Sequence, residues 1–421
     1  MVMNKAILEK VMLDNQKEVE EQEVTPRNFS FDGFDRYVIV GIRRAGKSYL
    51  LYQRIQQLLK DGHKWDEMLY LNFEDERLEG FSTQDFNMIL EAHMEMYGKR
   101  PMLFLDEVQN IAGWEKFARR LADAKYKVII TGSNAKMLSS DIQTTLGGRY
   151  IPIYVYPYSF KEFLEVSHVA YDRLSILSTE GKAKVVNRMN DYIHNGGFPE
   201  GALMKVKRDY LMSVYQKIYL GDIAARNNVT NVFGLKVMIK KIAESVKQPI
   251  SFNRIANIIS TTGTKLSTTS AVKYMGYLEE AWLINRVTNI ASKLADKEGN
   301  AKYYFTDNGI LNLFLIDAET SLLENLVAIY LTRKYGREDA VFFYNKGIEV
   351  DFYIPEDETA IQVSYSLRDE ETREREVKAL KTLQKVLPCK KLFIITYDDE
   401  DNWNLADDNI KVMPVWKWVL D

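Results

Sequence analysis

Short apolar runs alternate with longer stretches of helical periodicity through the first 160 residues of the chain. Four of these runs predict buried strands: residues 37–40, 68–71, 102–105 and 128–130. Helical spacing occupies 48–60 and 83–96, a fifth strand is expected within 151–155, and an amphipathic helix is expected before the first strand. Because strands that alternate with helices form parallel sheets, the pattern predicts an α/β fold with a doubly wound sheet.

The pattern changes in the second part of the chain. It is wholly helical from about 159 to 219, apart from a Gly-Gly-Phe-Pro sequence at 196–199. Residues 251–287 predict a helix-turn-helix in which a serine caps each helix, and 302–305 predict a returning strand or wing. Helices are then expected at 321–334 and 370–386. The strands expected beside them are 341–344, 350–354, 360–363 and 392–395.

The composition argues against several classes of protein. The 421 residues suffice for about three domains, and 46% hydrophobic with 27% charged residues is ordinary globular composition. A formal net charge of −3 gives no global positive field for nucleic acid, although a local basic patch is compatible with it. One cysteine and four histidines argue against a disulfide framework and against a thiolate or imidazole metal site. No segment approaches ~18 uncharged apolar residues, so we expect no membrane span and a cytoplasmic location.

One segment matches a phosphate-binding motif at every fixed position. It is the G-x-x-x-x-G-K-[ST] pattern, formed by Gly41, Ile42, Arg43, Arg44, Ala45, Gly46, Lys47 and Ser48. The glycines let the backbone turn its N–H groups into one concavity around phosphates, Lys47 reaches the β- and γ-phosphates, and the Ser48 hydroxyl binds Mg²⁺. The motif lies between a predicted strand and a predicted helix, as this chemistry requires. We therefore predict a nucleotide site that also includes the next residue, Tyr49.

Two acids follow the apolar run at 102–105, at the carboxyl end of a predicted parallel strand, where ligands bind in open α/β sheets. We expect Asp106 to support Mg²⁺ and Glu107 to orient and polarise the attacking water. No N-K-x-D motif for guanine follows the phosphate loop, which favours adenine. ATP or ADP with Mg²⁺ is therefore the predicted ligand.

With these motifs the chain resembles AAA+ ATPases, and the resemblance extends through residues 129–134. It implies that Asn134, or alternatively Ser133, senses the γ-phosphate; the other interpretation is a simple helix cap. It also implies an arginine finger from a neighbouring subunit, with Arg149 as the candidate and a surface salt bridge as the alternative. A homo-oligomer or a protein partner is expected for the same reason.

More closely, the chain resembles a prokaryotic group of AAA+ ATPases that have an uncharacterised carboxyl-terminal region. The shared stretches are residues 41–48, 73–78, 106–110, 196–200 and 362–367. The resemblance implies five segments: an N-terminal helix (1–25), an ATPase core (26–158), a helical connector or lid (159–220), a winged helix-turn-helix (221–318) and a PD-(D/E)xK nuclease-like domain (319–421).

The nuclease-like segment lacks the residues that metal-dependent cleavage needs. The resemblance places its acids at Glu324 and Asp351 and its (Asp/Glu)-x-Lys triplet at 362–364, where the chain reads Gln-Val-Ser. A neutral amide binds divalent cations weakly, and a serine carries no positive charge to activate water or hold phosphate. We therefore predict no nuclease activity.

The helix-turn-helix has four basic and two acidic residues within 251–287, a modest surplus for phosphate contact. It is expected to contact either DNA or a partner domain. The predicted function is Mg²⁺-dependent ATP hydrolysis that couples nucleotide state to movement of the carboxyl-terminal domains. The alternative is a nucleotide-gated DNA- or protein-binding module with little turnover.

Overall fold

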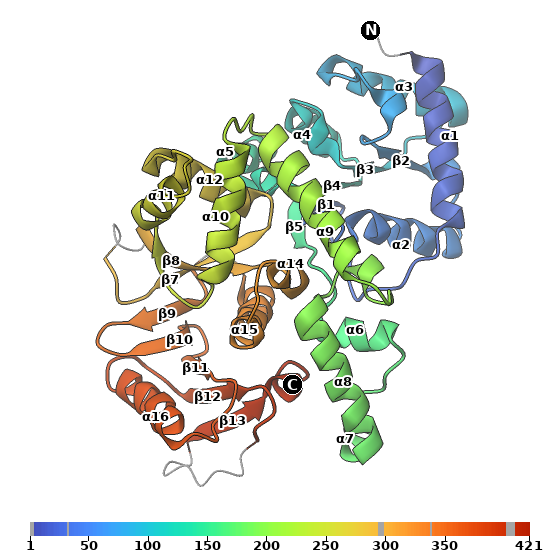
Figure 1. Cartoon of the computed structure of the whole chain (residues 1–421). Coiled ribbons are helices and arrows are strands. Elements are labelled where there is room, and N and C mark those ends of the chain that lie inside the picture. Colours follow the sequence, from blue (N-terminus) through green and yellow to red (C-terminus); the bar gives the residue numbers. More distant parts are fainter. Residues whose placement is uncertain (1–3, 32, 294–298, 337–338, 401–408) are drawn as a thin grey trace. The chain divides into compact units, whose positions relative to one another are not determined.

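The computed structural model describes residues 4–31, 33–293, 299–336, 339–400 and 409–421, and Figure 1 labels its elements. The chain divides into two compact units, Met1–Tyr156 and Pro157–Asp421, and each unit is described by itself. Among the described residues no helix is long and apolar enough to cross a membrane. The finer division into five segments remains a prediction.

The first unit is built on a five-stranded sheet in which every pair of neighbours is parallel. Its order is β2 (Met68–Asn72), β3 (Met102–Asp106), β4 (Val128–Gly132), β1 (Arg36–Val40) and β5 (Ile151–Tyr154). The four strands predicted from apolar runs are almost wholly buried, and the parallel α/β fold is confirmed. β5 is an edge strand with mostly exposed side chains, where a proline such as Pro152 is tolerated.

One helix precedes these strands and the others connect them. They are α1 (Lys5–Glu21), α2 (Lys47–Lys60), α3 (Phe86–Tyr97), α4 (Trp114–Asp123) and α5 (Ser140–Leu146), with short 3₁₀ turns η1 (Trp65–Glu67), η2 (Glu76–Leu78), η3 (Thr83–Asp85), η4 (Val108–Asn110) and η5 (Ala135–Leu138). α1 lies where the sequence predicts an amphipathic helix. It buries Leu8, Val11 and Val19 at helical spacing and packs against β2 and α3, so this helix is part of the unit's core.

The second unit begins with helices. They are α6 (Phe160–Val166), α7 (Arg173–Leu177), α8 (Thr179–Asn195), α9 (Arg208–Gln216) and α10 (Val232–Glu244), with the 3₁₀ turn η6 (Pro199–Gly201) and the π-helix η7 (Lys217–Ala225). The Gly-Gly-Phe-Pro sequence follows α8, its proline begins η6, and its glycines lie beside α14 (Asn308–Asn312). There the Gly197 N–H donates to Asp307 Oδ2 at 2.8 Å, and a Cβ on Gly196 would lie 2.0 Å from Asp307 Oδ1. The two glycines therefore allow the chain to pass close to a buried carboxylate.

A mixed eight-stranded sheet forms the rest of the second unit. Its order is β13 (Ile410–Pro414), β12 (Lys391–Thr396), β11 (Thr359–Val363), β10 (Glu349–Ile354), β9 (Phe342–Asn345), β7 (Ile284–Asn289), β8 (Asn300–Phe305) and β6 (Ile250–Ser251). Parallel pairing of β7 with β9, in register at Thr288 and Phe342, joins its two halves. The sheet thus runs across residue 319, where the sequence analysis places a domain boundary.

Two helices separate β6 from β7, in the segment predicted as a helix-turn-helix. α11 (Phe252–Ser260) begins after Ser251, whose hydroxyl accepts the N–H of Arg254. α12 (Thr268–Glu280) begins after Ser267, whose hydroxyl accepts the N–H of Ser270. Both serines cap a helix, as the sequence predicts.

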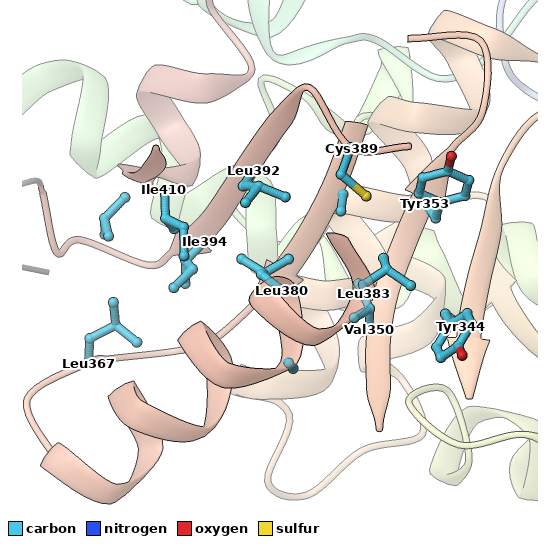
Figure 2. Packing of buried hydrophobic residues seen from close by; sticks show 13 residues of the cluster. Tyr344, Val350, Tyr353, Leu367, Leu380, Leu383, Cys389, Leu392, Ile394 and Ile410 are labelled. Atoms are coloured by element: carbon cyan, nitrogen blue, oxygen red, sulfur yellow. The ribbon is translucent and has the colours of Figure 1, made fainter. Parts of the chain in front are cut away.

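The carboxyl-terminal core lies between the sheet and α16 (Glu370–Gln384), as Figure 2 shows. Leu380 and Leu383 of α16 pack with Val350 of β10 and with Ile394 of β12. α15 (Glu319–Tyr335) contacts β8 and β11, and α17 (Val415–Trp418) follows β13. Because α15 contacts both halves of the sheet, its buried side chains meet residues from each half.

Candidate active site

The phosphate loop joins β1 to α2 and is shaped by its glycines. Gly46, the residue just before α2, has a left-handed backbone with φ 96°. Gly41 has φ 154°, and a Cβ there would lie 1.9 Å from the carbonyl oxygen of Val155. The first glycine of the motif is therefore required by a neighbouring backbone segment as well as by phosphate binding.

Arg27 bonds the loop to the last residue of the first unit. Its Nη1 donates to the carbonyl of Ala45 at 3.0 Å, and its Nη2 donates to the carbonyl of Tyr156 at 3.1 Å. Gln53 of α2 exchanges two hydrogen bonds of 2.9 Å with the backbone of Arg27. The loop and the end of the unit are thus bonded to the same guanidinium.

Lys47 is the first residue of α2, and only 3% of its side chain is exposed. Its Nζ lies 3.3 Å from the carbonyl oxygen of Ile42 and 3.4 Å from Oε1 of Glu107. The ammonium is thereby held between the loop and the acid that follows β3. This is the position from which it would meet phosphate.

Asp106 is completely buried at the end of β3. The Tyr70 hydroxyl donates to its Oδ2 at 2.9 Å, the Thr131 hydroxyl donates to its Oδ1, and the Ser48 hydroxyl is also hydrogen-bonded to this carboxylate. Burial and the neighbouring Glu107 raise the pKa of Asp106 to about 6. Ser48 and Asp106 therefore form an adjacent pair of oxygen ligands, and a cation there would favour the ionised carboxylate.

Glu107 adopts a left-handed backbone, with φ 50° and ψ 40°. Its N–H donates to Thr131 Oγ1 at 3.0 Å, which helps to hold this uncommon conformation, and its Oε2 accepts from Gln109 Nε2 at 2.5 Å. Burial opposes the charge, but Lys47 and Gln109 outweigh it and lower the pKa of Glu107. The carboxylate is ionised at neutral pH, as a group that polarises water must be.

Arg43 lies inside the loop, and its Nη2 donates to Oε1 of Glu74 at 2.9 Å. Its positive charge also helps to lower the pKa of Glu107. Arg43 therefore contributes to the electrostatics of the site while its guanidinium pairs with Glu74.

The remaining residues of the predicted nucleotide site differ in exposure. Ile42 and Ala45 are buried, so the loop is anchored in the unit's core. Arg44 is exposed and has φ 65°. Tyr49 is also exposed, and its hydroxyl donates to Oε1 of Gln22 at 3.1 Å. The structure thus places Arg44 and Tyr49 at the surface beside the loop.

The two candidate sensor residues follow β4 and have different partners. Asn134 accepts the N–H of Lys136 at 2.8 Å and caps η5. Ser133 is buried, Gln109 Nε2 lies 3.4 Å from its hydroxyl, and its hydrogen bonding helps to lower the pKa of Glu107. The geometry connects Ser133 to the acid, and the sensor role of either residue stays a prediction.

Arg149 lies at the opposite end of β1 from the phosphate loop. Its Nε donates to Oδ1 of Asp123 at 2.6 Å, and its carbonyl accepts from Nε of Arg36, the first residue of β1, at 3.0 Å. A five-residue strand, roughly 13 Å long, separates this position from the loop. An arginine-finger role for Arg149 would therefore require a neighbouring chain, and it stays a prediction.

Three further residues belong to the site, although the sequence analysis does not single them out: Tyr70, Thr131 and Gln109. Tyr70 and Thr131 lie in buried strands that flank β3, and the parallel register brings both beside its end. The only sequence signal is a polar group within an apolar run, which is equally compatible with ordinary core packing. Gln109 could have been noticed because it lies two residues after Glu107.

These groups fit a nucleotide with Mg²⁺. The loop N–H groups, the amino-terminal end of α2 and Lys47 are ligands for phosphate. The Ser48 hydroxyl and the Asp106 carboxylate are the hard oxygen ligands that Mg²⁺ takes. The ionised Glu107 lies next to the phosphate ligands and next to the Mg²⁺ ligands.

One family match is consistent with this geometry. The AAA domain family matches residues 34–164, and a domain of unknown function (DUF8612) matches residues 186–322. A Walker-type ATPase of Pyrococcus abyssi is 16% identical, with a TM-score of 0.38 over 71% of this chain and 99% of that chain. The Orc1 protein of Aeropyrum pernix, solved in complex with DNA, is 12% identical, with a TM-score of 0.31 over 77% of this chain and 92% of that chain. These scores are too low to relate functions.

Two relatives show the family. An uncharacterized protein of Haemophilus influenzae is 32% identical over 75% of this chain and 78% of its own length. An uncharacterized protein of Methanocaldococcus jannaschii is 34% identical over 100% of this chain and 96% of its own length. The chain therefore belongs to the same family as the Methanocaldococcus jannaschii protein, and it carries an AAA domain in its amino-terminal unit.

Proposed function

We propose that this protein binds ATP with Mg²⁺ and hydrolyses it at the phosphate loop. The observation that carries the proposal is the buried contact of Lys47 with Glu107, next to the Ser48–Asp106 pair. A lysine for phosphate, a pair of oxygens for the metal and an ionised carboxylate for water are the groups that this reaction needs. The AAA domain match over residues 34–164 supports it.

Each group has its own task in the reaction. The loop N–H groups and Lys47 bind the phosphates, while Ser48 and Asp106 would hold Mg²⁺, which supplies positive charge to the β- and γ-phosphates when bound. Glu107 orients a water molecule for in-line attack on the γ-phosphorus and accepts its proton. The bond to the β–γ bridging oxygen breaks, and ADP and phosphate are the products. Thr131 helps to hold Glu107 in its position.

Residues outside the loop complete turnover in this proposal. We favour Ser133 over Asn134 as the residue that senses the γ-phosphate. Ser133 is hydrogen-bonded to Glu107 and can act on it, whereas the Asn134 side chain caps η5. Arg149 acts on the nucleotide of a neighbouring copy, since within its own chain it pairs with Asp123. A homo-oligomer is then the active form, and adenine is the base.

The second unit is the part that hydrolysis moves. We assign α11 and α12, with the antiparallel pair β7 and β8, as a winged helix. We assign β9 to β13, with α15 and α16, as a nuclease-like domain that does not cleave nucleic acid. The support for these assignments is the order of the elements and the Gln-Val-Ser sequence at 362–364.

A second function rests on the exposed start of α12. Lys265, Thr268, Thr269 and Lys273 are exposed there, and such polar and basic groups contact phosphates of nucleic acids. In this alternative the protein turns over little ATP, and bound nucleotide gates the contact of this surface with DNA or a partner protein. Salt-dependent binding of duplex DNA that changes with bound nucleotide would support it.

Steady-state ATP hydrolysis by the wild type and by Glu107→Gln decides between the two functions. We expect the amide to lower kcat by about 10²–10⁴-fold with ATP affinity retained, because it cannot accept the proton. Glu79→Gln, which alters an exposed glutamate of the same unit, is the matched control and should hydrolyse like the wild type. Equal turnover by the wild type and Glu107→Gln would contradict the assignment. Tight ATP binding without wild-type turnover would favour the binding module.

A further inference from the structure

A lysine lies buried among three acids in the second unit. Lys302 belongs to β8, and its side chain is 0% exposed. Its Nζ lies 3.0 Å from Glu349 Oε1, 3.3 Å from Glu324 Oε1 and 3.4 Å from Asp351 Oδ1. It also lies 5.5 Å from the centroid of the Phe343 ring in β9. An ammonium group has three N–H donors, and three carboxylates surround this one.

The ammonium carries its charge at this position. A buried cation is costly unless it is paired, and burial by itself would lower the pKa of a lysine. Here Glu324, Asp351 and Glu349 outweigh burial and raise the pKa of Lys302 above its usual value. The group is therefore a permanent cation in the interior of the protein.

Other donors engage the acids around Lys302. The Tyr304 hydroxyl donates to Glu324 Oε1 at 2.7 Å. The N–H of Val363 donates to Asp351 Oδ2 at 2.9 Å. These bonds occupy one oxygen atom of Glu324 and one of Asp351.

Gln362 takes part in the same network. Its carbonyl oxygen accepts the N–H of Asp351 at 2.8 Å, and its Nε2 donates to Glu376 Oε2 at 2.6 Å. The amide thus acts as a structural bridge between β10, β11 and α16. Its oxygen is already bonded to the backbone rather than directed at an ion.

The nuclease resemblance implies Mg²⁺ at Glu324, Asp351 and position 362, and the residues present do not fit it. The Lys302 ammonium lies within 3.4 Å of Glu324 and Asp351. The residue at the third position, Gln362, is a neutral amide whose oxygen already accepts the N–H of Asp351. Throughout the described part of the chain, no group of three or more His, Cys, Asp or Glu side chains is arranged to hold a metal ion. The cation of this cluster is therefore a side chain of the protein itself.

We propose that the Lys302 ammonium is the resident cation of this acidic cluster and takes the place of a divalent metal ion. The cluster is an ionic bridge that needs no metal. It joins β8, from the half of the sheet next to α11 and α12, to α15 and to β10 of the other half. The second unit is thereby held as one body, and its acids are withdrawn from catalysis.

The test is Mn²⁺ binding by the full chain without nucleotide, measured by the electron paramagnetic resonance signal of the unbound ion. Every protein carries Asp106→Asn, so that the phosphate loop contributes equally to all. In that background Lys302 should prevent binding at the cluster, and Lys302→Ala should gain one Mn²⁺ ion per chain. Further substitution with Glu324→Gln and Asp351→Asn should remove the gained site.

Thermal unfolding gives the second readout. Lys302→Ala should lower Tm by on the order of 10 °C, since it leaves buried acids without their cation. Mn²⁺ should restore part of this loss and should leave the Tm of the Asp106→Asn parent unchanged. A folded Lys302→Ala protein that binds no more Mn²⁺ than its parent would overturn the proposal.

The proposal can be tested even where Lys302→Ala does not fold. The parent is then compared with its Asp351→Asn derivative. Equal Mn²⁺ binding by the two supports a cluster without metal, whereas Mn²⁺ binding by the parent that Asp351→Asn removes would overturn it. Cleavage of plasmid DNA by the wild type that Asp351→Ala abolishes would overturn it as well.

Discussion

The phosphate loop and the cluster around Lys302 contain the same three kinds of buried side chain. Each has a lysine, carboxylates and a tyrosine that donates to one of them: Tyr70 to Asp106 at 2.9 Å, and Tyr304 to Glu324 at 2.7 Å. In the first region the lysine extends from the end of a glycine-rich loop. In the second it extends from a strand within a sheet. Residue types alone therefore do not distinguish the proposed nucleotide site from the proposed ionic bridge.

The number of acids per lysine separates the two regions. Lys47 contacts one carboxylate, and the pKa of Glu107 is lowered. Lys302 is shared among three carboxylates. Burial together with Asp351 raises the pKa of Glu324 to about 7, although the nearby Lys302 lowers it. In the proposed reaction Lys47 would leave Glu107 and contact phosphate, whereas removing Lys302 would leave three acids facing one another.

The largest difference is expected when each lysine is removed. Lys47→Ala should weaken ATP binding by roughly 10- to 100-fold, because it deletes a charge-assisted contact to phosphate. Lys302→Ala should leave ATP affinity unchanged, since it alters only the second unit's interior. Isothermal titration with ATP and Mg²⁺ measures both. Unchanged affinity in Lys47→Ala would show that the nucleotide site is assigned to the wrong residues.

A third buried acid, Asp307, extends the comparison, because backbone N–H groups rather than a lysine donate to it. Asp307 accepts from Gly197 and Gly309, each at 2.8 Å, and burial raises its pKa to about 6. Between pH about 4 and 6 the folded state keeps a proton that the unfolded chain releases. This contribution to stability is complete below pH about 4 and is lost as pH rises through 6.

Asp307→Asn cannot titrate and isolates that contribution. The free energy of unfolding of the wild type, minus that of Asp307→Asn, should fall by about 2–3 kcal/mol between pH 4 and pH 7. Denaturant unfolding followed by tryptophan fluorescence at several pH values measures it. A difference that is constant with pH would mean that the folded state holds Asp307 ionised throughout.

The smallest effects are expected from the two tyrosines. Tyr70→Phe removes one donor to the buried Asp106, so it should change kcat/KM for ATP by about 2- to 10-fold and also cost about 1–2 kcal/mol of stability. Tyr304→Phe should leave ATP hydrolysis unchanged and cost about 1–2 kcal/mol of stability, since Glu324 loses a buried partner. Hydrolysis and thermal unfolding of both variants check the pair. Slower ATP hydrolysis in Tyr304→Phe together with unchanged hydrolysis in Tyr70→Phe would contradict the proposed assignment of the nucleotide site to the first region.

The sequence predicts well what is local along the chain. Residues 41–46 connect β1 to α2, Lys47 and Ser48 begin α2, and Asp106 and Glu107 lie at the end of a buried strand, so spacing along the chain is enough to predict them as candidates. The parallel sheet of the first unit follows from the same apolar runs. Caps such as Ser251 and Ser267 are equally local.

Contacts set by strand register are not visible in the sequence. Lys302 lies 49 residues from Asp351, and the two meet because β7 pairs with β9 and brings β8 near β10. Within the sequence Lys302 is one basic residue in an apolar strand. Tyr70 meets Asp106 for the same kind of reason, through the alignment of β2 with β3.

The guanidinium of Arg27 has a mechanical consequence. It bonds the carbonyl of Ala45, inside the phosphate loop, and the carbonyl of Tyr156, the last residue before the second unit. In the proposed reaction, a displacement of Ala45 on phosphate binding would therefore pull on Tyr156 through a single side chain, over two hydrogen bonds.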